Sequence, residues 1–298
     1  MDKYNANCFK DDYMTNLKEY LAGKLDVHEL EILPRSYDVV GDIAIVRLPE
    51  ALRHRAEEIA EAIMQINNHV KTVLNQISPV SGDFRLRRLE WIAGEKKTET
   101  IHKEHGCLFK VDLEKCYFSP RLSYERARIA KLVKPSEVIV NMFAGVGCFS
   151  IVIAKKSEAK KVYSIDINPW AVKYMKENIK LNRVCHIVTA VLGDSKDVIV
   201  KGLQGVADRV LMPLPEKAYE YIIYALKALK PCGGMIHYYD FVHASKGENP
   251  IHKIEEKISY KLALLKTDFE ISFGRIVRTT GPRWFQISLD IKINRKRL

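Results

Sequence analysis

One glycine-containing loop and two carboxylates have the spacing of a nucleotide-binding site. The loop at residues 141–149 follows a short apolar run and holds Gly145 and Gly147, which lack the Cβ that would keep a ligand away from the backbone. Asp166 and Asp194 each end a later apolar run, where one carboxylate can accept both ribose hydroxyls and the other an adenine amino group. A Gly-x-Gly pair alone is also typical of a tight turn. With both carboxylates present, we predict an adenosyl site of the kind that holds S-adenosylmethionine (SAM).

Charged residues just before this loop could act on a substrate. Arg121, Glu125 and Arg126 fall at i, i+4 and i+5 of an expected helix, so Glu125 can share a face with Arg121. A carboxylate flanked by guanidinium groups beside a methyl donor is suited to general-base catalysis. The same spacing is typical of a surface ion pair that contributes little to stability. Both interpretations stay open from these residues alone.

A basic run at residues 84–88 is a candidate for substrate binding. If these residues form a strand, Arg85 and Arg87 share one face and could contact a phosphate or a base edge. A solvated edge strand protected by charge has the same pattern. His102 and His105 are close enough to share a metal but are also typical of a polar loop. We expect no metal site.

The chain after about residue 115 must position the adenosyl site. It alternates strands with helices, which predicts a parallel sheet built from βαβ units. Strands are expected at residues 138–141, 161–166, 187–192, 209–212 and 235–239, helices at 148–155, 169–181, 216–230 and 254–266, and a closing strand pair at 269–277 and 284–293. This order favours an α/β fold with the Rossmann-like sheet of SAM-dependent methyltransferases over that of a dinucleotide dehydrogenase.

The chain before residue 115 predicts a smaller unit. Strands are expected at residues 39–46, 72–77, 84–92 and 106–112, with one helix at 48–67. We therefore expect a small N-terminal α+β domain before the methyltransferase sheet. The predicted division is a helical lead-in at residues 1–28, a small α+β RNA-binding domain at 29–115 and a SAM-dependent methyltransferase domain at 116–298.

Composition limits the partners and the compartment. The 298 residues include 48 Lys and Arg against 37 Asp and Glu, and the resulting net charge of +11 favours a polyanion such as nucleic acid or a membrane surface, although a solvated basic surface is an alternative. No run approaches the roughly 20 apolar residues of a spanning helix, and the first residues do not resemble a signal peptide. We expect a cytoplasmic protein without a membrane partner. The 6 cysteines have no Cys-x-x-Cys spacing, so we expect free thiols.

Several long motifs occur in the order found in one enzyme family. The sequence resembles the archaeal and eukaryotic tRNA guanine-37 N1-methyltransferases over about residues 30–295. The motifs that carry the resemblance are at residues 94–106, 117–126, 141–147, 166–169 and 236–239. In that family the small domain and the SAM domain clamp the anticodon region of tRNA. The resemblance implies SAM as cofactor and the anticodon arm of tRNA as partner, and we expect a monomer.

The resemblance also implies roles for individual residues. Glu125 would take the N1 proton, with Arg85 and Arg121 as further catalytic residues. Arg85, Arg87, Pro213 and Pro215 would contact the substrate. The implied cofactor-binding residues are Arg126, Phe143, Gly145, Gly147, Asp166, Ile167, Asp194 and Ser195.

Two departures from the family pattern bear on the substrate. The family begins with an extra domain that reads the tRNA elbow, and this chain has only a short lead-in. The family also carries Asn-Leu-Pro after the fourth strand, where this chain has Met212 and then Pro213-Leu214-Pro215. The change resembles the bifunctional archaeal branch, whose members also methylate C7 of the wyosine precursor imG-14. Because proline donates no hydrogen bond, the pocket would be more apolar.

Other functions remain as alternatives. A related enzyme of wyosine synthesis uses SAM to transfer an aminocarboxypropyl group, but it does not keep the whole Pro-Arg-x-x-x-Glu-Arg run seen at residues 120–126. A cytosine-C5 methyltransferase would need a cysteine after the fourth strand, and an adenine-N6 enzyme an Asn/Asp-Pro-Pro-aromatic motif there. Both are absent. A non-catalytic RNA-binding module would have no need of Glu125, Asp166 and Asp194 together.

Overall fold

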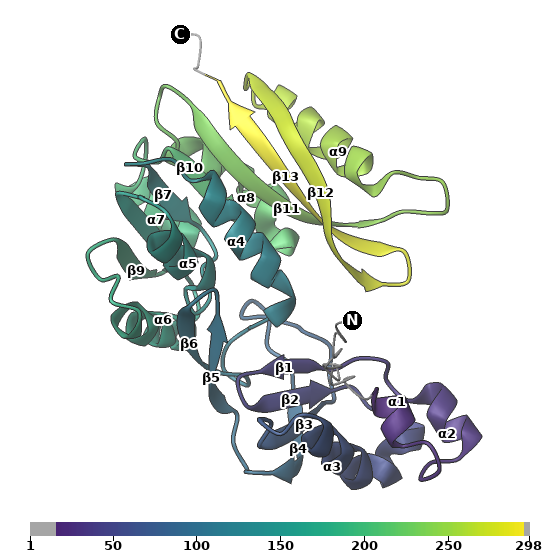
Figure 1. The fold of residues 1–298 in the computed structure, drawn as a ribbon. Helices are drawn as coiled ribbons and strands as arrows, with labels where there is room; N and C mark the ends of the chain where they lie inside the picture. The colour runs from purple at the N-terminus through teal and green to yellow at the C-terminus, as the bar shows by residue number, and fades with distance from the viewer. Residues whose placement is uncertain (1–15, 295–298) are drawn as a thin grey trace, which may run out of the picture. The chain divides into compact units, whose positions relative to one another are not determined.

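The computed structural model describes residues 16–294, which fall into two compact units (Figure 1). Unit 1 contains the described residues up to Pro79 together with Arg87–Lys97, and unit 2 contains Val80–Leu86 and the residues from Thr98 onward. Most of the predicted lead-in, residues 1–15, lies outside the described residues. The contacts place the division at residues 97 and 98, whereas the sequence predicted it at 115 and 116.

Unit 1 is a four-stranded mixed sheet with helices. Strands β1 and β2 are antiparallel, β2 and β3 parallel, and β3 and β4 antiparallel. Its core gathers apolar residues from every helix, including Leu17, Leu21, Ile59 and Ile63, so the N-terminal turns are part of this unit. The elements are α1 (Leu17–Tyr20), α2 (Val27–Ile32), β1 (Asp38–Val40), β2 (Ile43–Val46), η1 (Glu50–Arg55), α3 (Ala56–Ile66), β3 (Thr72–Gln76) and β4 (Leu89–Gly94).

Two strand predictions in this part of the chain are wrong. The single strand expected at residues 39–46 is a hairpin, because Gly41 adopts a positive φ of 57° and turns β1 back onto β2. The strand expected at residues 84–92 begins only at Leu89. Before it, Ser81 and Leu86 pair across a turn in which Arg85 has a left-handed φ of 54°. Arg85 and Arg87 therefore do not share a strand face.

Unit 2 is built on a seven-stranded sheet of order β12-β13-β11-β10-β7-β8-β9. The five strands from β9 to β11 are parallel, and β13 runs antiparallel to both of its neighbours. Strand order reverses between β7 and β10, where doubly wound sheets bind ligands. The strands are β7 (Val138–Asn141), β8 (Lys161–Asp166), β9 (Val188–Leu192), β10 (Arg209–Met212), β11 (Gly234–His243), β12 (Phe269–Gly281) and β13 (Trp284–Ile293).

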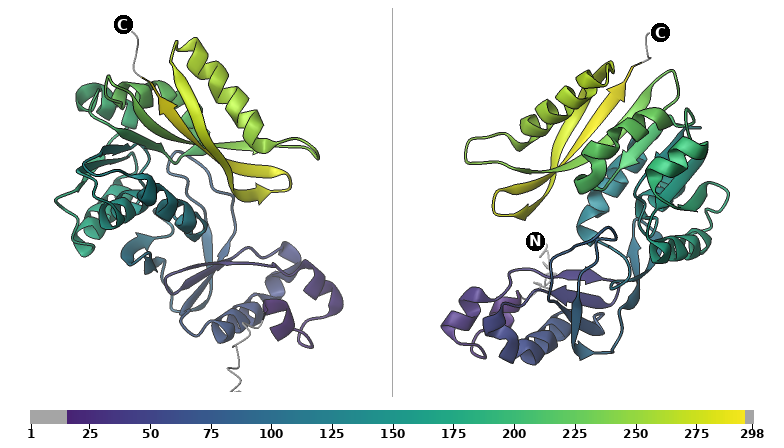
Figure 2. Two further views of the ribbon diagram at one scale, coloured as in Figure 1. Left: turned by 45° about the horizontal axis from the view of Figure 1, so that its top comes forward. Right: turned by 180° about the vertical axis from the view of Figure 1, so that it is seen from behind.

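Helices cover both faces of this sheet. Three of them share one apolar cluster with β10, β11 and β13, and two of these, α8 and α9, lie in front of the strands when the molecule is seen from behind (Figure 2). The short helix α7 was not predicted from the sequence. The helical elements of the unit are η2 (Pro120–Leu122), α4 (Ser123–Leu132), α5 (Cys148–Lys156), α6 (Pro169–Leu181), α7 (Ser195–Gly202), α8 (Pro215–Ala228) and α9 (Pro250–Leu264).

A hairpin of β5 (Glu99–Glu104) and β6 (Cys107–Asp112) belongs to unit 2. The side-chain amides of Asn178 on α6 and of Asn182, its C-cap residue, each donate to and accept from the backbone, of Lys110 and Leu108 respectively. These bonds hold the hairpin against α6. In the part of the chain described by the structure, no helix is both long enough and apolar enough to span a membrane.

Candidate active site

A cavity of about 340 Å³ lies at the carboxyl ends of the parallel strands of unit 2. Residues just after β7, β8, β9 and β10 line it, together with residues 83–85, which also belong to unit 2. It is therefore located where the strand order reverses. Its lining residues include Arg85, Tyr117, Phe143, Gly145, Asp166, Ile167, Asp194, Ser195, Pro213, Lys217 and Tyr221.

Asp166 is held firmly at the end of β8. Its two carboxylate oxygens accept from the backbone N–H groups of Gly145 at 2.6 Å and Asn168 at 2.9 Å. Burial raises the pKa of Asp166, while these backbone hydrogen bonds act against that rise. Each oxygen keeps a further lone pair, and the residue lines the cavity, so Asp166 can accept from a hydroxyl pair.

The next strand end supplies Asp194 and Ser195. Asp194 caps α7 by accepting from the backbone N–H of Lys196 at 3.0 Å, and its other oxygen accepts from the hydroxyl of Tyr221 at 2.9 Å. Burial raises the pKa of Tyr221, and the bond to Asp194 raises it further. The Ser195 side chain is buried and its Oγ has no hydrogen-bond partner among residues 16–294. An unsatisfied hydroxyl on a cavity wall fits a site for a polar ligand.

The two glycines of the loop have different physical roles. Gly145 lines the cavity and adopts a φ of 57° that favours glycine. Gly147 caps α5 with a φ of 93°, and a Cβ there would lie 2.9 Å from Cγ of Met175 on α6. Gly147 does not line the cavity, so its absent side chain permits the packing of α5 against α6.

Arg85 reaches the cavity from the turn that precedes β4. Its guanidinium lies 4.3 Å from the centre of the Tyr117 ring and forms an ion pair with Glu216 at 3.2 Å. Its Nε is buried and has no hydrogen-bond partner in the stretch from residue 16 to residue 294. At the cavity wall, Arg85 thus has a guanidinium stacked on an aromatic ring and an Nε that can still donate a hydrogen bond. Arg87 instead donates to Gln76 within unit 1 and does not line the cavity.

Pro213 lines the cavity just beyond β10, whereas Pro215 is buried as the first residue of α8 and does not. The sequence predicted that both prolines contact the substrate. In the structure Pro213 is a wall residue, and Pro215 begins a helix. Phe143 and Ile167, two of the residues predicted to bind the cofactor, also line the cavity. Phe143 packs edge to face on Tyr221 at a ring separation of 5.5 Å.

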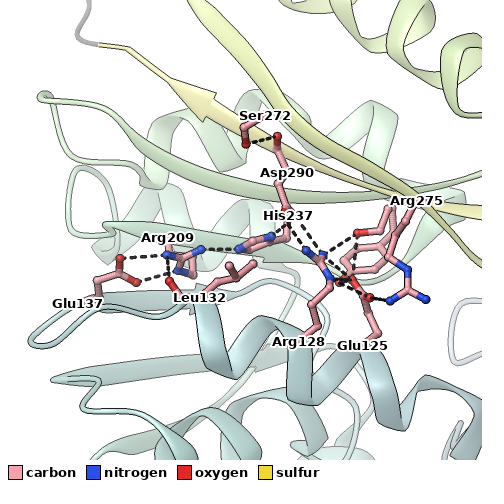
Figure 3. A network of polar contacts seen from close by, with 11 residues as sticks. Glu125, Arg128, Leu132, Glu137, Arg209, His237, Ser272, Arg275 and Asp290 are labelled. Atoms are coloured by element: carbon pink, nitrogen blue, oxygen red, sulfur yellow. Dashed lines mark hydrogen bonds and ion pairs between the residues drawn. The ribbon is translucent and has the colours of Figure 1, made fainter.

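Glu125 does not line this cavity. Only 1% of its side chain is exposed, and it lies in the polar network of Figure 3. Arg128 donates to both of its carboxylate oxygens, at 2.7 to 3.1 Å, and the hydroxyls of Tyr239 and Ser288 donate to Oε1 at 2.8 and 3.0 Å. The predicted partner Arg121 is exposed and is also not part of the cavity wall. Arg128, which the sequence did not indicate as a partner, holds Glu125 through three hydrogen bonds.

Arg126, expected at the cofactor, is buried elsewhere. It donates to Glu104 on β5 at 2.6 Å and to the backbone carbonyl of Ser119 at 2.9 Å. Its guanidinium also faces the rings of Phe118 and Phe149. This prediction is corrected, because a fully buried ion pair that joins the β5–β6 hairpin to α4 leaves Arg126 no access to the cavity.

His102 and His105 do not form a metal site with other ligands. His102 lies on β5, packs against the Phe118 ring and has a pKa lowered by burial. His105 lies in the hairpin turn beside Ser123. Among residues 16–294, no group of three or more His, Cys, Asp or Glu is arranged to hold a metal ion.

Two cavity residues come from a helix that the sequence did not connect to the site. Lys217 and Tyr221 lie four residues apart on α8, so they share one helix face. Their spacing was visible in the sequence, but which face of α8 meets the strand ends depends on how the helix packs. The sheet order and this cavity define a class: a doubly wound α/β protein with a ligand cavity at its switch point.

Comparison with known proteins identifies the family. Residues 100–263 match the TRM5/TYW2 methyltransferase domain, and residues 17–98 match the TYW2 N-terminal domain. The chain therefore belongs to the TRM5/TYW2 methyltransferase family, as its motifs predicted.

Three curated relatives differ in the reaction that their names describe. The tRNA (guanine(37)-N(1))-methyltransferase Trm5b of Pyrococcus abyssi is 43% identical, over 88% of this chain and 76% of the relative. The tRNA 4-demethylwyosine(37)-methyltransferase Taw21 of Saccharolobus solfataricus is 40% identical, over 86% and 93%. The tRNA(Phe) (4-demethylwyosine(37)-C(7)) aminocarboxypropyltransferase of Methanocaldococcus jannaschii is 37% identical, over 87% and 98%.

Two solved structures share the fold. The complex of aTrm5 with tRNALeu superposes with a TM-score of 0.81 at 39% identity, covering 94% of this chain and 79% of that one. The TYW2 of P. horikoshii in complex with MeSAdo superposes with a TM-score of 0.76 at 30% identity, covering 94% and 98%. The predicted α/β methyltransferase fold is confirmed.

Proposed function

We propose that the protein is a SAM-dependent tRNA methyltransferase that acts on N1 of guanosine 37. The observation that carries this proposal is the single cavity wall on which Asp166 and Asp194 lie with Arg85, Tyr117 and Pro213. The carboxylates suit the ribose and adenine of a cofactor, and the arginine and tyrosine suit a purine. The names of the relatives with 40% identity or more place their methyl transfer at position 37 of tRNA, which supports the same target here.

The residues present fit the cofactor. Asp166 offers free lone pairs at the end of β8, and Ser195 offers a buried hydroxyl that has no partner in the described part of the chain. Asp194 is fixed by Tyr221 so that its carboxylate faces the cavity wall. SAM bound there would supply an electrophilic methyl group.

The protein must then remove a proton and position a base. Guanine N1 carries a proton at neutral pH, so a base has to take this proton as the nitrogen forms its bond to the methyl carbon. We assign this role to Glu125 at the start of α4, as the family motif implies; because its carboxylate is 1% exposed and does not line the cavity, it must be uncovered when the RNA binds. Arg85, stacked on Tyr117, would hold the guanine through its free Nε donor and its guanidinium face.

A second reaction is supported by Pro213. At the position where an amide is usual in the family, this residue presents an apolar ring to the cavity and donates no hydrogen bond. A site of this kind can accept the tricyclic wyosine precursor as well as guanine. C7 methylation of that precursor is therefore our second candidate activity. The protein would act as a monomer on the anticodon arm, in the cytoplasm.

The test is mass analysis of nucleosides after incubation with SAM and three RNAs. These are a tRNA transcript with G37, the same transcript with A37, and tRNA that carries the wyosine precursor. We expect N1-methylguanosine only from the G37 transcript. Methylation that ignores the change from G to A would overturn the assignment, and an aminocarboxypropyl mass on the precursor would identify the rival reaction.

A further inference from the structure

The surface beside Glu125 holds an arginine with an unusual set of contacts. Arg275 on β12 lies with its guanidinium 4.4 Å from the centre of the Tyr124 ring, and 67% of Tyr124 is exposed. Its polar contacts among the described residues are Nη1 to Oε2 of Glu125 and Nε to the carbonyl of Ile276, both at 3.4 Å. Both distances are long for hydrogen bonds to a guanidinium.

In two neighbouring arginines, all three guanidinium nitrogens donate hydrogen bonds within the protein. Arg128 donates from Nε, Nη1 and Nη2 to Glu125, Ser288 and Asp290. Arg278 donates from all three nitrogens to Gln286, Ser119 and Tyr117. Arg275 by contrast keeps Nη2 without a partner in residues 16–294, and 26% of its side chain is exposed.

The charges of the buried network explain why Arg275 stays near Glu125. Glu125, Asp290 and Glu137 supply three negative charges, and Arg128 and Arg209 supply two positive ones (Figure 3). His237 adds none: its Nε2 lies 2.6 Å from Nη1 of Arg209, which can only donate, so Nε2 is the acceptor and Nδ1 donates to Asp290. Arg275 supplies the positive charge that balances the third carboxylate.

We propose that Arg275, stacked on Tyr124, is a binding site for a backbone phosphate of the RNA substrate, and that phosphate binding draws it away from Glu125. A guanidinium forms two parallel bonds to a phosphate at about 2.8 Å, which are stronger than its 3.4 Å contact with the carboxylate. Tyr124, which is largely exposed, offers its ring face to the guanidinium at the protein surface. The proposal rests on the proposed RNA methylation and adds a named contact.

Departure of Arg275 has a consequence for Glu125. The contact on Oε2 would be lost, leaving this oxygen with the Arg128 Nε alone, while Oε1 keeps its four donors. The network would also lose the charge that balances its third carboxylate. RNA binding would thus change both the contacts and the charge around Glu125.

The experiment compares Arg275→Gln with wild type in methyl transfer to a G37 transcript and in equilibrium binding of that transcript. We expect the KM and Kd for tRNA to rise about tenfold, as for the loss of one charged hydrogen bond. The kcat should stay within about twofold, since the lost contact serves binding. The slope of log affinity against log salt should decrease by about 0.7, the value for one phosphate contact with a single strand.

Three further variants separate the explanations. Arg275→Lys keeps the charge and should keep the wild-type salt slope, with an intermediate KM. Tyr124→Ser removes the stacking partner and should raise the KM about threefold. Arg183→Gln removes a charge from an exposed arginine in the turn after α6 and should change neither value.

Two results would overturn the inference. One is a fall in kcat with unchanged KM and salt slope, because Arg275 would then act only on Glu125. The other is an Arg275→Gln protein that matches wild type in every measurement. If wild type itself fails to methylate the G37 transcript, the proposed function fails instead. The binding and salt measurements still decide the role of Arg275 in that case.

Discussion

His237 and Arg209 are buried side by side, with Nε2 of the histidine 2.6 Å from Nη1 of the arginine. Because arginine has no acceptor, this contact fixes His237 as the neutral tautomer that carries its proton on Nδ1. That proton is donated to Asp290 at 2.6 Å. The pair therefore connects the carboxylate of Asp290, and through Arg128 that of Glu125, to Glu137 at the far end of the network.

The first prediction concerns pH. Burial lowers the pKa of His237 below its ordinary value, so as the pH falls below about 6.5 the unfolded chain takes up a proton that the folded chain does not. The free energy of unfolding must therefore decrease over this range. His237→Asn can still donate to Asp290. It should reduce the slope of the free energy of unfolding against pH by up to about 1.4 kcal/mol per pH unit. Urea unfolding from pH 7 to 5 measures it, with the exposed His252→Asn as control.

The second prediction concerns the buried end of the network. Arg209 is 2% exposed and bonds to Glu137 through two nitrogens. Arg209→Met should lower the free energy of unfolding by about 3 to 5 kcal/mol, because it leaves a carboxylate without its partner. Arg53→Met breaks a surface pair with Glu50 and should cost less than about 1 kcal/mol. Equal losses in denaturant titrations would contradict the importance of burial here.

The third prediction tests the proposed base. Glu125→Gln keeps an acceptor for Tyr239 and Ser288 but cannot take a proton. We expect the single-turnover methylation rate to fall by about 10² to 10⁴, the range for a general base. SAM affinity should be nearly unchanged, because Glu125 does not line the cavity.

A matched control is available for this variant. Glu256→Gln changes the same group on the exposed face of α9, and the rate should stay at the wild-type value. An undiminished rate in Glu125→Gln would remove Glu125 from the base role. Thermal melting of both variants shows whether a slower rate reflects loss of folded protein.

The fourth prediction tests the cofactor site. Asp166→Ala removes the acceptor for the proposed ribose hydroxyls, and calorimetric titration with SAM should show a loss of about 1.5 to 3 kcal/mol in binding free energy. Asp197→Ala removes an exposed carboxylate on α7 and should leave the affinity as it is. Wild-type affinity in Asp166→Ala would mean that the adenosyl group does not bind at the end of β8.

The sequence predicted the sheet and its ligand-binding edge well. Apolar runs alternate with amphipathic helices after residue 115, and the predicted helix at 169–181 has the observed bounds of α6. Since parallel strands end at one edge, Gly145, Asp166 and Asp194 had to lie near one another. Local patterns therefore sufficed for these positions.

Local patterns did not suffice for Arg85, Arg126 and Glu125. The sequence predicted a strand over residues 84–92. The turn at residues 81–86, with its left-handed Arg85, was therefore not predicted. A sequence motif does not show which side of its helix meets the cavity. Arg126 was therefore placed at the cofactor on the motif alone. In the structure it meets β5 instead.

The sequence alone determined the fold class, the family and the strand ends that form the cavity, because these depend on periodicity and on short motifs. Only the tertiary structure decided the surroundings of Glu125. Its partners Tyr239 and Ser288 are 114 and 163 residues away along the chain, and Asp290 is 162 residues from Arg128. No spacing in the sequence relates such residues. They meet because β11 and β13 pair in one register beneath α4, which is a property of the packed sheet.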